Sequence, residues 1–145
     1  MDILVTTPKS EIENARQEGI DIQNNPYGYW FRTFRGKPNV NPDTNLDKIY
    51  FVENGLITGY GYIFNLEQIS EAMECNTTKR MWGKKGWWVV EYKHWHWLKE
   101  KIPFKGFQGF RYIDNIPKLR EKLQRVTNDG LPPTAKAVGI RPTIL

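Results

Sequence analysis

The sequence predicts an α+β domain in which about five or six strands form a small mixed barrel flanked by two or three helices. Three observations support this fold class. Short apolar and aromatic runs recur along the chain with turn residues between them, which is typical of strands. Helical patterns are few and short. No repeat or linker divides the chain, so we expect residues 1–126 to form one domain and residues 127–145 a C-terminal tail or a wrap over the core.

The N-terminal segment is expected to form a strand, a helix and a second strand. The run Ile3 to Thr6 is apolar and β-branched, as strands are. Thr7 and Pro8 then fit the N-cap and the first position of a helix over about residues 8–18, and Gly19 fits its end. Ser10 and Glu13 have the spacing of a capping box and fit an alternative start. The aromatic-rich run Tyr27 to Phe34 is expected to be the second strand.

A hairpin is expected at the centre of the fold. Two apolar runs, Lys48 to Val52 and Leu56 to Leu66, flank the segment Glu53-Asn54-Gly55. An Asn-Gly pair between such runs is the strongest short signal for a tight hairpin turn. Gly59 and Gly61 interrupt the returning strand, which indicates a bend, a bulge or a close approach of backbone.

The second half is expected to hold two further strands and a final helix. Residues 68–73 fit a short helix, and residues 75–86 are polar, basic and glycine-containing, so they fit a long loop. Strands are expected over residues 87–98 and 107–113. Asp114 or Asn115 would cap the final helix. Its apolar stripe consists of Ile116, Leu119, Leu123 and Val126.

Charge is distributed unevenly along the chain. The formal net charge is +5, yet residues 1–70 hold 6 Lys and Arg against 9 Asp and Glu, whereas residues 71–145 hold 15 against 7. The basic half predicts an anionic partner. The single cysteine, Cys75, excludes an internal disulfide and a Cys-rich zinc site. The sequence shows no signal peptide and no membrane-spanning run, so we expect a cytoplasmic protein with no membrane partner.

Aromatic residues and cations are interleaved between Trp82 and Tyr112. This stretch holds five of the six tryptophans and seven Lys or Arg residues. Rings that stack on bases and cations that neutralise phosphates are the combination that nucleic-acid surfaces use. Alternation along residues 87–98 places Trp95 on one face with Trp87 and Trp97, and Tyr92 on the other. Large rings on both faces favour an open groove, although a core that absorbs all of them remains the alternative.

Two segments of the chain resemble the PUA-like superfamily, in particular its ASCH and EVE branches. Residues 49–61 (IYFVENGLITGYG) are similar to its barrel hairpin, and residues 102–112 (IPFKGFQGFRY), after a Trp-rich strand, are similar to its closing strand. The order of strands and helices also matches over most of residues 1–126. The resemblance implies a PUA-like pseudobarrel with a cleft that receives RNA, DNA or a single base. In the related YTH and EVE branches, an aromatic cage receives a modified base.

The favoured function is therefore a nucleic-acid binding module that grips one flipped or modified base in an aromatic, basic cleft. Trp82 lies in a polar, cationic loop where no core pattern requires it, so we expect it to stack on a base. Gln108 can contact a base edge, and Lys105 and Arg111 can hold phosphate. The full set of expected contact residues is Trp30, Arg32, Lys37, Trp82, Trp88, Lys105, Gln108 and Arg111.

One structural feature would distinguish aromatic rings that bind a ligand from rings that only pack in the core. Two or more of four tryptophans lining a single concave basic cleft would favour a ligand. These four are Trp30, Trp82, Trp87 and Trp88.

The alternative function is a small enzyme on the same scaffold. Some ASCH proteins of this size act as ribonucleases or nucleoside amidohydrolases with a Lys, Thr and Glu set, in which Lys precedes Thr by three positions. Here Trp30 lies three positions before Thr33, so that pattern is absent. A general base and a nucleophile would have to lie close together. The candidates are Glu53, Glu91, Lys105, Thr33 and His94.

No cofactor and no metal site is expected. His94 and His96 lie two apart on one strand and are expected to share a face, which would supply two metal ligands. No third ligand follows at a recognisable spacing. One of the two histidines remains a candidate base contact or general base.

Overall fold

The protein is described here from a computed structural model, which places residues 1–25, 27–44 and 46–127. Its strands are β1 (Ile3–Thr6), β2 (Trp30–Phe34), β3 (Lys48–Glu53), β4 (Leu56–Gln68), β5 (Met73–Glu74), β6 (Met81–Trp82), β7 (Trp88–Pro103) and β8 (Phe110–Tyr112). Its helices are α1 (Ile12–Gln23) and α2 (Leu119–Thr127), with 3-10 turns at Lys9–Glu11, Pro42–Thr44 and Ile113–Asn115.

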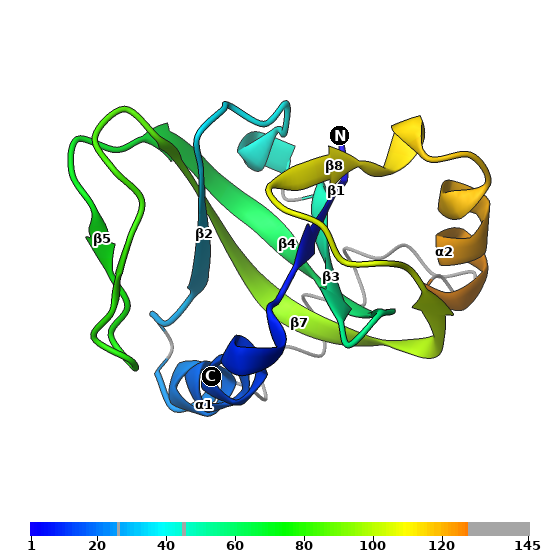
Figure 1. Ribbon diagram of the computed structural model, residues 1–145, viewed down its shortest axis with the longest axis horizontal. Coiled ribbons are helices and arrows are strands. Elements are labelled where there is room, and N and C mark those ends of the chain that lie inside the picture. The colour runs from blue at the N-terminus through cyan, green and yellow to red at the C-terminus, as the bar shows by residue number, and fades with distance from the viewer. Residues whose placement is uncertain (26, 45, 128–145) are drawn as a thin grey trace.

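Six of these strands form one mixed sheet that curls into a half-barrel (Figure 1). The strand order is β2-β7-β4-β3-β1-β8, and only the β1–β3 pair is parallel. The short strands β5 and β6 pair with each other outside this sheet. The predicted α+β class with a curled mixed sheet and flanking helices is confirmed.

The predicted central hairpin is formed by β3 and β4. Asn54 and Gly55 have φ angles of +51° and +75°, the left-handed conformation that both central residues of a type I′ turn require. Glu53 and Leu56 pair directly across the turn. The Asn-Gly signal therefore fixes both the position of the turn and the register of the hairpin.

Bulges between β4 and β7 bend the sheet at the two predicted glycines. The pairing register shifts between Ile57 and Gly59 and again between Tyr60 and Tyr62. A Cβ at Gly59 would lie 2.4 Å from the backbone oxygen of His96, so the two strands approach too closely for any side chain there. Bulges increase the local twist of paired strands, so these two irregularities contribute to the curl of the sheet.

The two faces of the sheet carry separate apolar clusters. One cluster packs under α2, where Leu119, Leu123 and Val126 of the predicted stripe are buried, while Ile116 precedes the helix and is partly buried. The other cluster lies inside the curl. Its buried members are Ile3, Val5, Trp30, Phe34, Val40, Ile49, Phe51, Ile63, Val90 and Tyr92.

The predicted start of the first helix is shifted by one residue, and its predicted end is wrong. The helical segment begins with the 3-10 turn at Lys9, whose N-cap is Pro8 with no side-chain cap, and the Thr7 hydroxyl instead accepts a hydrogen bond from Arg32 of β2. Gly19 does not end the helix, which continues to Gln23. A Cβ at Gly19 would lie 3.5 Å from the Trp30 ring, an ordinary van der Waals distance, so neither helix termination nor packing requires a glycine here.

The predicted helix over residues 68–73 is also wrong. The Ile69 backbone donates to the Trp87 oxygen, and the Gly86 backbone donates to the Ile69 oxygen. These bonds carry the β4–β7 ladder into the hairpin that holds β5 and β6, so pairing with β7 overrides the local helical preference.

Simple alternation along β7 fails at His94. Its φ of +62° and the register shift opposite Gly61 make a bulge. Trp95 is therefore packed in the same cluster as Tyr92 and Val90, whereas the alternation predicted opposite faces.

The predicted tail lies almost wholly outside the described residues, since only Thr127, the last residue of α2, belongs to them. The division of the chain at residue 126 stays a prediction. In the part of the chain that is placed, no helix is both long and apolar enough to span a membrane.

The turn of the central hairpin can be tested with a glycine pair. Gly55→Ala should lower the free energy of unfolding by about 1–2 kcal/mol, because an L-residue is strained in the left-handed region. No atom lies within 4 Å of a Cβ at this position, so steric contact adds nothing. Gly36 is equally open but has no positive φ, so Gly36→Ala should be neutral or slightly stabilising. Urea denaturation measures both variants, and equal effects would contradict the turn assignment.

Candidate functional site

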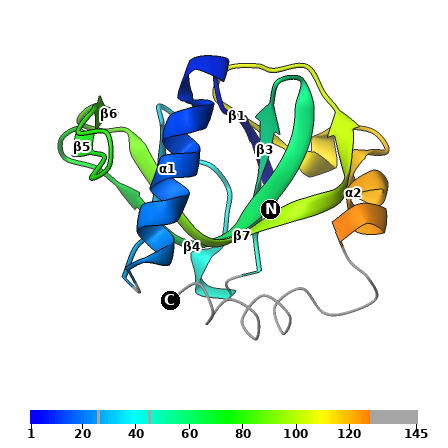
Figure 2. The ribbon, with the colours of Figure 1, turned by 90° about the horizontal axis from the view of Figure 1, so that it is seen from below.

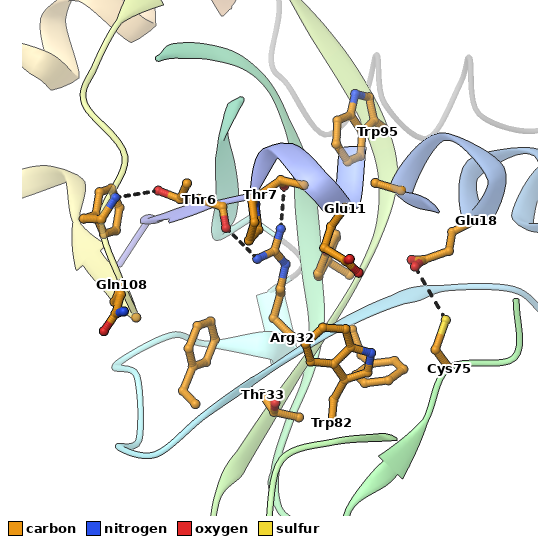
Figure 3. Close-up of a pocket in the computed structure, with 17 residues that line it drawn as sticks. Thr6, Thr7, Glu11, Glu18, Arg32, Thr33, Cys75, Trp82, Trp95 and Gln108 are labelled. Carbon is orange, nitrogen blue, oxygen red and sulfur yellow. Dashed lines mark hydrogen bonds between the residues drawn. The ribbon is translucent and has the colours of Figure 1, made fainter. Parts of the chain in front are cut away.

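A pocket of about 320 Å³ lies beside the half-barrel, between α1, β2, β7 and the β5–β6 hairpin (Figure 3). This volume is at the lower end of the range of roughly 300–1,000 Å³ for small-molecule sites. The residues that line it are Thr6, Thr7, Pro8, Glu11, Ala15, Glu18, Phe31, Arg32, Thr33, Phe34, Cys75, Trp82, Tyr92, Trp95, Phe107, Gln108 and Gly109.

Aromatic rings make up much of the wall, and most of them are fixed by the core. Trp95 stacks on Phe51 with ring centroids 4.2 Å apart, and Tyr92 stacks on Trp30 at 6.1 Å. Trp82 differs, because it comes from β6, outside the main sheet, and is 36 % exposed. The pocket therefore has a rigid aromatic floor and one ring on a peripheral hairpin.

Arg32 crosses the middle of the pocket and joins β2 to the end of β1. Its Nη1 donates to the Thr6 backbone oxygen at 3.0 Å, and its Nη2 donates to Thr7 Oγ1 at 2.6 Å (Figure 3). Burial raises the pKa of the nearby Tyr92 phenol, and the Arg32 charge partly opposes that rise. Much of the hydrogen-bonding capacity of Arg32 is thus taken up within the protein.

Two carboxylates on α1 and the turn before it also face the pocket. Glu11 accepts hydrogen bonds from Arg80 at both oxygens. Glu18 accepts one from the Cys75 thiol, with 3.5 Å between Oε1 and Sγ. Burial raises the pKa of the Glu18 carboxyl above its usual value. Two acidic side chains and one basic side chain line the pocket, so its interior lacks the basic character that the sequence predicted.

Apart from Arg32, the cations near the pocket lie around it rather than in it. Arg80 lies over the Trp82 ring at 4.7 Å, and Arg111 lies over the Phe107 ring at 4.5 Å. Lys105 is exposed just before Phe107. Basic side chains thus flank the pocket on the β5–β6 hairpin, on β8 and on the segment before β8.

A second, smaller pocket adjoins the first. It has a volume of about 150 Å³ and lies between the C-terminal half of α1 and β5. Glu18, Phe31 and Cys75 line both pockets. The contact between Glu18 and Cys75 therefore stands at the boundary between them.

Three of the eight predicted contact residues line the larger pocket. They are Arg32, Trp82 and Gln108. Trp30 is 8 % exposed and is packed in the core, where it borders only the smaller pocket. Lys37 lies over the Trp88 ring at 4.9 Å, outside both linings.

Lys105 and Arg111 lie on either side of the pocket-lining segment 107–109 without lining it themselves. Of the four tryptophans whose convergence would favour a ligand, only Trp82 reaches the larger pocket, since Trp87 and Trp88 do not line it. The criterion for ligand binding, that two or more of these four tryptophans line one basic cleft, is therefore not met. The second ring is Trp95 instead, which the bulge at His94 turns to this side.

Glu18 and Cys75 were missed by the sequence analysis. They are 57 positions apart, and no spacing rule joins them. In the sequence, Glu18 has the pattern of an ordinary polar residue on a surface helix. The only available signal was Cys75 itself, the single cysteine in a polar segment.

The catalytic candidates are not brought together. Thr33 lines the larger pocket, but the other four residues do not. Glu53 is bound to Arg16 and Thr58, and Glu91 accepts a hydrogen bond from Asn65. Among the placed residues, no group of three or more His, Cys, Asp or Glu is arranged to hold a metal ion.

Comparison with known proteins adds no relative to these observations. No family model, curated protein or solved structure matches the chain.

The α1 wall of the pocket is held to the sheet by one polar contact. No described side chain of α1 is buried, but Arg16 donates to both oxygens of Glu53, at 2.7 and 3.0 Å. Glu53 is only 3 % exposed and also accepts from Thr58 Oγ1 at 2.7 Å. The Arg16 guanidinium lies over the Trp97 ring at 4.6 Å. Figure 2 shows the helix crossing the curled sheet at this place.

Removal of the Arg16 side chain should therefore destabilise the fold. Arg16→Ala leaves a buried carboxylate with one fewer partner, and we expect a loss of about 1–3 kcal/mol in the free energy of unfolding. Gln17→Ala, on an exposed position of the same helix, should change it by less than about 0.5 kcal/mol. Urea denaturation compares the two. A loss for Arg16→Ala no larger than that of the control would show that the contact does not anchor the helix.

Proposed function

We propose that this protein is a PUA-like domain of the ASCH or EVE type that binds RNA or DNA and holds one flipped base in the larger pocket. The curled mixed sheet with flanking helices is compatible with such a pseudobarrel. The observation that carries the proposal is the pocket itself, a space of about 320 Å³ walled by six aromatic side chains and flanked by cationic segments.

The pocket and its surroundings suit different parts of a nucleotide. A base needs a flat apolar slot with a few polar groups, and extrusion from a strand gives it access to such a slot. The Trp82 ring has Arg80 on one face, which leaves the other face for a base. The phosphates would remain outside, within reach of flanking cations such as Lys105 and Arg111.

A small ribonuclease or nucleoside amidohydrolase of the ASCH kind is the second candidate. One observation favours it: Thr33 lines the same pocket as Glu18, and burial raises the pKa of Glu18, a property common in general acids and bases. No lysine lines this pocket, whereas the small ASCH hydrolases use one. Binding without turnover is thus the better supported function. Cleavage of an RNA strand or of a base-acylated nucleoside by the purified protein would reverse that order.

The role of Trp82 can be tested by substitution. Trp82→Ala should weaken binding of a short single-stranded oligonucleotide by about 1–3 kcal/mol, the usual contribution of one stacked base. Met81 is the neighbouring residue of β6, is 57 % exposed and does not line the pocket, so Met81→Ala should leave affinity unchanged. Fluorescence titration gives the affinities, and thermal melting reports any loss of fold. A lowered melting temperature with unchanged affinity would identify Trp82 as a purely structural residue.

The contribution of the surrounding cations can be tested through salt. Affinity for the oligonucleotide should fall steeply as salt rises, because bound phosphates release counterions. Lys105→Ala should reduce the slope of log K against log salt by about one unit without changing base preference. Lys122→Ala is the control, since α2 lies at the end of the molecule opposite the β5–β6 hairpin (Figure 1). Absence of binding at low salt would refute the proposed function.

A further inference from the structure

We propose that Glu18 selects the base in the larger pocket and that the base it selects is guanine, whose two adjacent N–H donors meet the two oxygens of the carboxylate. This inference rests on the proposed function and adds a specificity-determining residue to it.

Glu18 is placed where it can contact a ligand at one end of the pocket. In Figure 3, Glu18 and Cys75 lie at one end of the lining, Gln108 lies at the other, and Arg32 lies between them. The Cys75 thiol is the only hydrogen-bond donor to Glu18 among the placed residues. A thiol is a weak donor, so most of the accepting capacity of this carboxylate is unused.

The other charged groups of the pocket have strong partners, and among its neutral groups the Trp95 Nε1–H is buried without one. Arg32 donates to Thr6 and Thr7. Glu11 is paired with Arg80. Thr6 Oγ1 accepts a hydrogen bond from the Phe107 backbone at 3.0 Å. Glu18 is thus the charged group of the pocket with the weakest hydrogen-bond partner, and a partly buried carboxylate without strong donors is costly unless a ligand supplies them.

The chemistry of the carboxylate determines which base fits. An ionised carboxylate only accepts hydrogen bonds, and it does so at two oxygens side by side. The Watson–Crick edge of guanine carries a ring N–H next to an amino group, so it supplies two parallel donors. Adenine and cytosine place an acceptor nitrogen beside their amino group, and uracil and thymine flank their single N–H with two carbonyls. These acceptors would face the carboxylate and repel it.

The selection should depend on pH in a stated direction. The charged and titratable groups around Glu18 are Glu11 and Asp21 along the chain, Arg32 on β2, Tyr92 on β7 and Cys75 beside β5. Burial is the largest influence and raises the pKa of Glu18, which Cys75 and Arg32 partly oppose. Guanine requires the ionised form. Its affinity should therefore fall as pH drops through the raised pKa, because a protonated Glu18 loses one acceptor.

Short oligothymidine strands with one central guanine, hypoxanthine or adenine test the inference by fluorescence titration. The guanine strand should bind about 10- to 100-fold more tightly than the adenine strand, the discrimination expected of one two-point contact. Hypoxanthine lacks the amino group and should lie between them. Glu18→Gln gives adenine a matching donor and acceptor, so the guanine preference should fall at least about tenfold.

Glu13→Gln is the matched control, since Glu13 is exposed on the same helix and lines neither pocket. It should keep the guanine preference of the unaltered protein. Equal binding of all strands, or a guanine preference that persists in Glu18→Gln, would overturn the role of Glu18 while leaving base binding intact. Failure of every strand to bind would instead overturn the proposed function together with this inference.

Discussion

The arrangement of α1, the sheet and the pocket depends on the hydrogen bonds of the buried Glu53 carboxylate. A carboxylate that is 3 % exposed needs donors, and it obtains them from Arg16 of α1 and from Thr58 of β4. No described side chain of α1 is fully buried, although Ile22 packs partly buried against the inner cluster, and the bonds to Glu53 add a polar contact between the helix and the end of β3. The buried carboxylate at the end of β3 requires hydrogen-bond donors, and its bonds to Arg16 thereby help to position α1, which forms one wall of the pocket.

Much of the sheet could be predicted from local signals. Asn54 and Gly55 specify the turn between β3 and β4 because both conformations that it needs are left-handed. The apolar stripe of α2 could likewise be predicted from the local sequence alone. What could not be predicted is the bulge at His94, since a bulge depends on how two strands far apart in the sequence come into register. That single extra residue turns Trp95 toward α1 and invalidates the alternation along β7.

The candidate site was less predictable than the fold. Trp82, Arg32 and Gln108 were identified from residue type and loop context, and all three line the larger pocket. Glu18 was not identified, because a carboxylate on an amphipathic helix has the same sequence pattern whether it faces solvent or a cavity. The basic charge of the second half of the chain lies outside the pocket, so charge counting predicted the surroundings of the site better than its interior.

The β5–β6 hairpin supplies Trp82 to the pocket, yet its own strands are only two residues long. Two exposed contacts connect this hairpin to the α1 region: Arg80 with Glu11, and Thr77 with Asp21 at 2.5 Å. An exposed ion pair weakens as ionic strength rises. Added salt therefore acts on the mouth of the pocket as well as on the attraction of a polyanion. The strength of the Arg80–Glu11 pair, which connects the hairpin to the turn before α1, is thus an ionic-strength-dependent property of the empty protein.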